Sequence, residues 1–239
     1  MHLRHQHIVN PIDYVYPSRL QDSLVRQRLD YKVLSPTLRA QAHNPAPTLL
    51  TFQTTPTYTC GRREVSTISS EQIAHLRNNG TAAFHTAQRG GQTTFHGPGQ
   101  LTAYLIVDLR EHKLTPRCYV RFLETSVIET CKRYGISSFT TENPGVWVSD
   151  GEKIASVGVH LRRNVTSHGI GLNISTDLSW FDRIVACGLP DKKTVNFEKM
   201  AVRGKGVDEV GGIFAEVVAE GMEGVEGVEK IELAEDLLK

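Results

Sequence analysis

The segment RGGQTTFHGPGQLTAYLIVDL, from Arg89 to Leu109, joins a glycine-rich stretch to a long apolar run. The apolar run from Leu101 to Leu109 predicts a strand, and a second strand is expected just before the segment, at Ala82–Ala87. A pure linker would not carry the threonines, Phe95 and His96, and an RNA-binding tract would repeat the Arg-Gly-Gly triplet, which occurs once. Glycine has no side chain and tolerates positive φ, so the backbone here is expected to pass close to other protein atoms or to a substrate. The segment indicates either a tight turn packed on protein or a loop packed on a substrate.

Composition and charge narrow the class of protein. The chain has 239 residues, which is enough to bury a sizeable core within one domain. Its 27 basic and 26 acidic residues nearly cancel, so no overall field attracts nucleic acid or anionic lipid. No apolar run approaches the roughly twenty residues that cross a bilayer. These features predict a soluble globular domain with neither a nucleic-acid nor a membrane partner.

The cysteines give no sign of a metal centre. They are widely spread and form no CxxC pair, which argues against a zinc module and against a disulfide scaffold: Cys60, Cys118, Cys131 and Cys187. Reduced thiols and no metal site are therefore expected.

Helical and strand patterns alternate along the rest of the chain. Apolar periodicity and end signals predict helices over Ser18–Leu34, Ser70–Asn78, Thr115–Gly135 and Val207–Ala219. Strands are expected at Thr48–Gln53, Val146–Ser149, Lys153–Leu161 and Ile170–Ile174, with a hairpin turn at Asp150-Gly151. Strands that occur both in hairpins and between helices predict a single α/β (α+β) domain, a mixed sheet backed by helices. Its core is expected over about 18–200, before a C-terminal tail at 201–239 that includes the low-complexity tract GMEGVEGVEK.

Three blocks of the sequence, taken together, resemble one enzyme family. They are RGGQTTFHGPGQLTAY (89–104), GVWVSDGEKIASVGVHLRRNVTSHGIGLN (145–173) and DLSWFDRIVACGLPDKKTV (177–195). In order and spacing they resemble the octanoyltransferases, also called lipoyl transferases, and the resemblance extends from about Gly61 to about Val195. The chain departs from the family pattern at Ala186, where proline is usual, and at TVNFEK (194–199), where Thr-Ser-Leu is usual. The resemblance implies the biotin/lipoyl protein ligase-like fold.

The resemblance also implies the residues of the site. It places an acyl-thioester cysteine at Cys187 and its partner lysine at Lys153. It places the acyl pocket on three segments: Arg89, Gly90, Gly91, Gln92, Thr93, Thr94, Phe95 and His96; Ser156, Val157 and Gly158; and Gly169, Ile170 and Gly171. The chemistry agrees, because a thiol whose ordinary pKa is about 8.5 needs a nearby base or cation to become a nucleophile. A lysine can serve as either.

The reaction implied by the resemblance joins two protein partners. The donor is an acyl carrier protein that bears octanoyl-phosphopantetheine, and the acceptor lysine belongs to lipoyl domains of 2-oxoacid dehydrogenase complexes or to glycine cleavage H protein. A thioester is already activated, so neither ATP nor a metal cofactor is expected, and the chain has neither GxxxxGK(S/T) nor GxGxxG. Two alternatives stay open: an ATP-dependent lipoate or biotin protein ligase-like enzyme, and a non-catalytic relative. The presence of both Cys187 and Lys153 favours the transferase.

The start of the chain bears on its location. The stretch MHLRHQHIVNPID carries no acidic residue before Asp13 and no hydrophobic secretory core. It is similar to the end of a mitochondrial presequence. The resemblance implies either mitochondria or the bacterial cytoplasm, and the basic start favours mitochondria.

Overall fold

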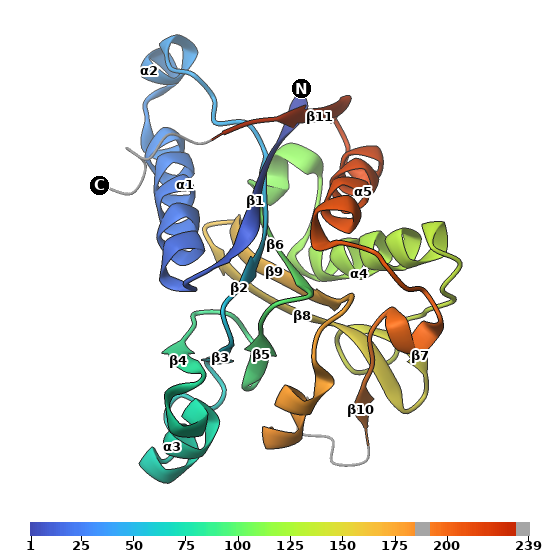
Figure 1. Cartoon of the computed structure of the whole chain (residues 1–239). Helices are drawn as coiled ribbons and strands as arrows, with labels where there is room; N and C mark the ends of the chain where they lie inside the picture. The colour runs from blue at the N-terminus through green and yellow to red at the C-terminus, as the bar shows by residue number, and fades with distance from the viewer. Residues whose placement is uncertain (185–191, 233–239) are drawn as a thin grey trace.

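A large mixed sheet forms the centre of the protein, in a computed structural model that describes residues 1–184 and 192–232 (Figure 1). The order of its strands is β10-β8-β9-β6-β2-β1-β11, with β7 paired to β8. The pairs β1–β2, β1–β11 and β8–β10 are parallel, and the other pairs are antiparallel. In spatial order the strands are β10 (Lys193–Thr194), β8 (Glu152–Arg162), β9 (Val165–Asn173), β6 (Gln100–Ile106), β2 (Thr48–Thr54), β1 (His2–Ile12) and β11 (Gly227–Lys230), and β7 is Val146–Ser149. The predicted mixed sheet and the hairpin of β7 and β8 are confirmed.

Helices cover both faces of this sheet (Figure 1). Helix α1 (Val15–Val33) lies on one face, whereas α4 (Pro116–Arg133) and α5 (Val207–Gly221) pack together on the other. Alternate residues of the central strands serve the two faces, so that Leu49 belongs to the core under α4 and α5 and Leu50 to the core under α1. Within the described ranges no helix has the length and apolar character to span a membrane. The remaining helical segments in the described part of the chain are short: α2 (Pro36–Gln41), α3 (Ser70–Arg77), η1 (Asn78–Gly80), η2 (Leu109–His112), η3 (Leu178–Arg183) and η5 (Glu198–Met200).

A second, smaller sheet lies beside the first. Its order is β4-β3-β5, with bounds Ala83–Thr86, Thr57–Cys60 and Thr94–His96. The glycine-rich segment therefore leaves β4 of the small sheet, forms β5, and enters β6 of the large sheet. Gly99 makes the turn between β5 and β6 with φ of +78°, a conformation that favours glycine. The segment thus connects the two sheets.

Local sequence signals determine several helix ends. Ser69 and Gln72 form a reciprocal capping box at the start of α3. Thr115 caps α4 by accepting the Cys118 N–H, and Pro116 occupies the first helical position. Beyond the end of α4, Gly135 adopts φ of +74°. The helices expected at these places are confirmed.

Both ends of the described chain belong to the large sheet. Residues 2–12, which resembled the end of a presequence, form β1 between β2 and β11, and Leu3 is fully buried there. Part of the low-complexity tract forms β11, which pairs with the start of β1. Before it, α5 buries Val210, Phe214 and Val218 in the main core. The sheet is therefore completed by two strands that the sequence patterns did not predict.

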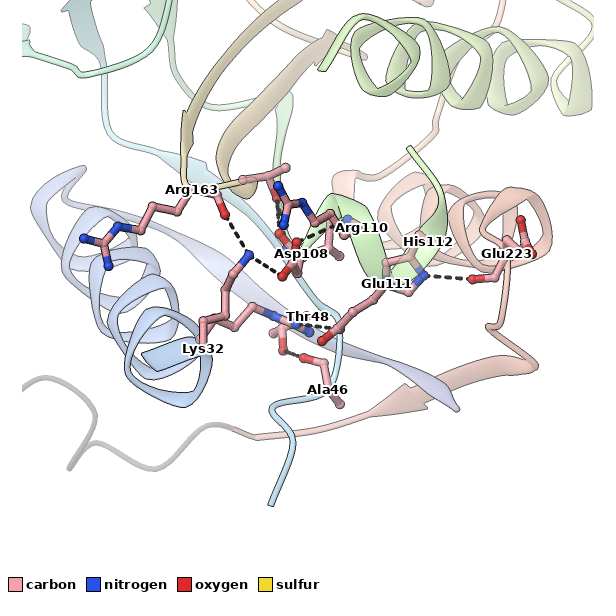
Figure 2. Close-up of polar contacts among 12 residues, drawn as sticks. Lys32, Ala46, Thr48, Asp108, Arg110, Glu111, His112, Arg163 and Glu223 are labelled. Atoms are coloured by element: carbon pink, nitrogen blue, oxygen red, sulfur yellow. Dashed lines mark hydrogen bonds and ion pairs between the residues drawn. The ribbon is translucent and has the colours of Figure 1, made fainter. Parts of the chain in front are cut away.

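A polar network fixes the C-terminal half of α1 against the sheet (Figure 2). Lys32 Nζ pairs with the carboxylate of Asp108 and donates a hydrogen bond to Arg163 O at 2.7 Å (Figure 2). Arg28 Nη1 forms an ion pair with Glu111 Oε2 at 3.0 Å, and the Arg28 side chain is only 3% exposed. These contacts attach α1 to η2 and to the turn between β8 and β9.

Candidate active site

A cavity of about 320 Å³ lies against strands β5, β6, β8 and β9. Its lining includes residues from all three segments that the resemblance assigned to the site, although these segments are far apart in the sequence. The predicted residues that line it are Lys153, Arg89, Gly90, Gly91, Gln92, Thr93, Thr94, His96, Ser156, Val157, Gly158, Gly169, Ile170 and Gly171. The fold therefore brings these residues around one space.

Among the predicted site residues that the structure describes, Phe95 does not line this cavity. Phe95 is fully buried behind the wall, where its ring stacks on Trp180 with centroids 5.2 Å apart and meets Phe181 edge-on. The alternation of side chains along β5 explains this orientation, since Thr94 and His96 line the cavity and the residue between them points the other way. Cys187 lies outside the described residues.

Arg89 holds the glycine-rich loop in place. Its guanidinium donates to Thr59 O at 2.6 Å, to Gln92 O at 2.8 Å and to Gly90 O at 3.0 Å. The same loop is held from outside by Glu64, whose carboxylate accepts the Thr93 N–H at 2.6 Å. Burial lowers the pKa of Arg89. The arginine therefore acts first as a brace for the backbone that lines the cavity.

The glycines of the site have different roles. Gly91 has φ of +85°, and an added Cβ would have only Arg89 Nη1 within 4 Å, at 3.5 Å, so the conformation rather than crowding requires glycine there. Gly158 is crowded, since a Cβ would lie 3.0 Å from Arg89 Cδ. Gly169 is more crowded still, because a Cβ would lie 2.1 Å from Ala103 O. The loop packs on protein through Arg89, as one expectation had it, and it also lines the cavity, where contact with a substrate stays a prediction.

A chain of hydrogen bonds connects the loop with the strand that carries Lys153. His96 Nδ1 bonds Gln100 Oε1 at 2.7 Å, and Gln100 Nε2 donates to Asn173 Oδ1 at 2.9 Å. Asn173 Nδ2 donates to Val195 O at 3.1 Å, and Val195 N donates to Lys153 O at 2.9 Å. Burial lowers the pKa of His96 to about 4, so its ring is neutral near pH 7. His96 is thus a structural hydrogen-bonding residue as well as part of the wall.

Lys153 is buried at the cavity, with a relative exposure of 4%. Its Nζ donates to Pro144 O at 2.5 Å and lies 5.1 Å from the centroid of the Trp147 ring. Pro144 directly precedes β7 and Trp147 belongs to β7, the strand paired with β8. On the other edge of β8, Thr194 of β10 is the register partner of Lys153. The Lys153 Nζ is therefore contacted from the β7 side of β8, and the backbone of Lys153 pairs with β10 on the other side.

Several residues of the wall were not predicted from the sequence. They include Arg63, Tyr104, Val120, Asn143, Pro144, His168, Asn173, Phe181 and Thr194. Among the described residues His168 Nδ1 has no hydrogen-bond partner, and the residue adopts φ of +59° inside β9. Burial lowers the pKa of His168 to about 3. Its place in the second of the three blocks that resemble the family, directly before Gly169, was the only signal that could have drawn attention to it.

The fold and this cavity define a catalytic domain of the lipoyl protein ligase type. The structure of a lipoate protein ligase from Thermoplasma acidophilum with bound lipoic acid superimposes with a TM-score of 0.68 at 15% identity, covering all of this chain and 93% of that one. At that identity the likeness shows the fold alone. The family model of the lipoyl protein ligase A/B catalytic domain matches residues 13–218, and the chain belongs to this family.

Within the family, similar proteins are octanoyltransferases. A Schizosaccharomyces pombe protein named "Probable octanoyltransferase" is 47% identical over 195 residues, which cover 81% of this chain and 84% of that protein. A Danio rerio protein named octanoyl-acyl-carrier-protein:protein N-octanoyltransferase, mitochondrial, is 38% identical over 198 residues, or 83% of each chain. The predicted assignment to the octanoyltransferases, and so to the acyltransferases, is confirmed. The mitochondrial location agrees with the names of such relatives.

Proposed function

We propose that this octanoyltransferase moves an octanoyl group from an acyl carrier protein to a lysine of a lipoyl-accepting protein, with Cys187 as acyl carrier and Lys153 in proton transfer. The name of the Danio rerio relative gives an acyl carrier protein as donor and a protein as acceptor. The observation that carries the proposal is the buried Lys153, whose side chain lines a cavity built from three glycine-rich segments. The acceptors are lipoyl domains of 2-oxoacid dehydrogenase complexes and glycine cleavage H protein.

The described residues on either side of 185–191 support the role of Cys187. Phe181 before this segment and Thr194 after it both line the cavity that Lys153 lines. The chain between them therefore begins and ends at the same site. Cys187 is close enough in sequence to both Phe181 and Thr194 to serve as the nucleophile.

The reaction needs two acyl transfers. In the first, the Cys187 thiol gives its proton to Lys153 Nζ, and its sulfur attacks the octanoyl thioester. The carbon–sulfur bond to the carrier breaks, and the leaving thiolate takes the proton back from Lys153. In the second, the acceptor amine attacks the new thioester, and Lys153 receives a proton from that nitrogen. The carbon–sulfur bond to Cys187 breaks, and the Cys187 thiolate takes this proton back from Lys153.

The same scheme explains why activation by ATP is not required. A thioester exchanges for a thioester in the first transfer, and an amide forms from a thioester in the second, so both steps start from an activated acyl group. Each passes through a tetrahedral oxyanion, which backbone N–H groups of the glycine-rich walls can stabilise. We propose that neither a nucleotide nor a metal takes part.

The paired walls of β8 and β9 suit an acyl chain. Val157 and Ile170 are register partners, and so are Gly158 and Gly169, and all four of these residues line the cavity. At about 0.8 kcal/mol for each buried CH₂, the octanoyl tail can contribute roughly 5 kcal/mol to binding.

The proposal is tested by supplying two kinds of donor to the enzyme and a lipoyl domain. We expect acceptor octanoylation with octanoyl-acyl carrier protein in the absence of ATP, and none with free octanoate and ATP. Lys153→Arg should lose most of the rate because a guanidinium does not release its proton. The matched control Lys193→Arg changes an exposed lysine on the neighbouring strand and should keep it. Transfer that requires ATP and octanoate would establish a ligase instead.

A further inference from the structure

Glu124 is a buried carboxylate on the side of α4 that faces the cavity. It is 6% exposed, and it lies one helical turn after Val120, which lines the cavity. In residues 1–184 and 192–232 it forms no ion pair with a basic side chain. Burial of an unpaired carboxylate is unfavourable unless hydrogen bonds compensate it. Its Oε1 instead accepts a hydrogen bond from the backbone N–H of Gly145 at 2.9 Å.

The same peptide group also contacts Lys153. The peptide between Pro144 and Gly145 presents its N–H to Glu124 at 2.9 Å and its C=O to Lys153 Nζ at 2.5 Å. In a trans peptide the N–H and the C=O point in opposite directions, so this one unit lies between the Glu124 carboxylate and the Lys153 Nζ. A hydrogen bond to a charged group polarises the peptide and strengthens the bond at its other end.

The turn around this peptide passes very close to the end of the Lys153 side chain. Gly145 has φ of +119°, and an added Cβ would lie 2.2 Å from Lys153 Cε and 2.7 Å from Nζ. Glycine therefore allows the backbone to pass directly over the end of the lysine side chain. The conformational freedom of glycine also means that the peptide before it can rotate if nothing holds its N–H.

We propose that Glu124 is a positioning residue for Lys153: it holds the Pro144–Gly145 peptide in the orientation that points Pro144 O at Lys153 Nζ. The inference rests on the proposed function, in which Lys153 Nζ carries the proton in both transfers. Loss of the acceptor on α4 releases the peptide, and Lys153 Nζ loses a hydrogen bond that helps to fix it beside the reacting groups. Glu124 itself touches neither substrate nor Cys187 in this role.

Two substitutions of similar size separate the hydrogen bond from the packing. Glu124→Met removes the acceptor and Glu124→Gln keeps one, while Glu129→Met changes an exposed glutamate on the same helix. With octanoyl-acyl carrier protein as donor, we expect Glu124→Met to lower kcat by about a hundredfold, the effect of roughly 1 Å of misplacement, with KM for the donor within about twofold. Glu124→Gln should recover at least a tenth of the wild-type kcat, and Glu129→Met should match the wild type. Thermal unfolding confirms that each variant is folded at the assay temperature.

A double substitution tests whether the effect passes through the lysine. In the Lys153→Met background, Glu124→Met should lower kcat no further, because residues that act through one another are not additive. The inference would be overturned by additive losses of kcat in the double variant, or by a Glu124→Met variant that keeps the wild-type kcat or changes only KM. A Glu124→Gln variant as slow as Glu124→Met would overturn it as well. Wild-type rates in Lys153→Met would instead remove the proposed role of Lys153, and the positioning role with it. The two failures are thus told apart by the Lys153→Met variant alone.

Discussion

Gly145→Ala adds a single methyl group at the point where the backbone crosses Lys153. The new Cβ would lie 2.2 Å from Lys153 Cε and 2.6 Å from Ala155 O. Carbon atoms do not approach so closely, so either the lysine end or the turn must move by about 1 Å. Ala155 belongs to β8 and pairs with both β7 and β9, so this strand has little freedom to give way. The lysine and the turn therefore take up the displacement.

Both the rate and the stability should respond. A displacement of roughly 1 Å at a catalytic group lowers the rate by about a hundredfold, so kcat for octanoyl transfer should fall by that factor. The strain of a non-glycine residue at φ of +119° adds about 1–3 kcal/mol of destabilisation, which corresponds to a decrease in Tm of roughly 2–12 °C. The measurements are single-turnover transfer from octanoyl-acyl carrier protein and thermal unfolding by circular dichroism.

Gly99→Ala is the matched control. Gly99 also has a positive φ, of +78°, and a Cβ there would lie 2.6 Å from the carbonyl carbon of Ser175, but the residue does not belong to the cavity wall. Both variants should lose stability, and at a temperature where both are folded only Gly145→Ala should lose the rate. Equal rates for the two folded variants would refute the view that Gly145 exists to accommodate Lys153.

Three further outcomes are expected. Arg89→Met removes the hydrogen bonds that hold Gly90 and Gln92, so kcat/KM for octanoyl transfer should fall at least tenfold; an unchanged value would show that the loop holds its shape without the arginine. Burial lowers the pKa of His96 to about 4 and of His168 to about 3, so the unfolded state binds more protons than the folded state below pH 6.5. The free energy of unfolding should therefore fall as the pH drops from about 6.5 towards 4, by roughly 1.4 kcal/mol per pH unit for each histidine. Urea unfolding at several pH values measures this slope, and a flat profile would contradict it. Glu111→Leu leaves Arg28 buried without its carboxylate partner and should lower the free energy of unfolding in urea by about 3–5 kcal/mol. Adding Arg28→Met should restore most of this loss, and additive losses in the double variant would count against a buried ion pair.

Local patterns predicted most of the elements of this fold. The caps at Ser69 and Thr115 and the turn at Asp150-Gly151 act through residues a few positions apart, so the sequence is sufficient to recognise them. Parallel pairing of β1 with β11 joins the two ends of the chain, and no local pattern reports such a contact. The basic start and the glycine-rich tail each lacked a strand-like alternation, which is why both strands were missed.

The residues of the site, like the elements of the fold, could be predicted from the sequence only in part. Family resemblance located the segments that surround the cavity, because long blocks such as those around Lys153 carry enough information to be recognised. It did not distinguish Phe95, which points away from the cavity, from its two neighbours in β5, which line it. Glu124 could not be found from the sequence, since a glutamate within a helix is usually solvent-exposed. Only the packing of α4 against the Pro144–Gly145 turn reveals its contact.

The most direct test of the proposed mechanism is the intact mass of the enzyme after brief incubation with octanoyl-acyl carrier protein, followed by peptide mapping. The account predicts one octanoyl group, on Cys187, and loss of both the adduct and the transfer in Cys187→Ala. Alanine at the other three cysteines, the buried Cys60 and Cys131 and the exposed Cys118, should leave the adduct in place. An octanoyl group on a different residue, or transfer by Cys187→Ala at the wild-type rate, would contradict the thioester mechanism.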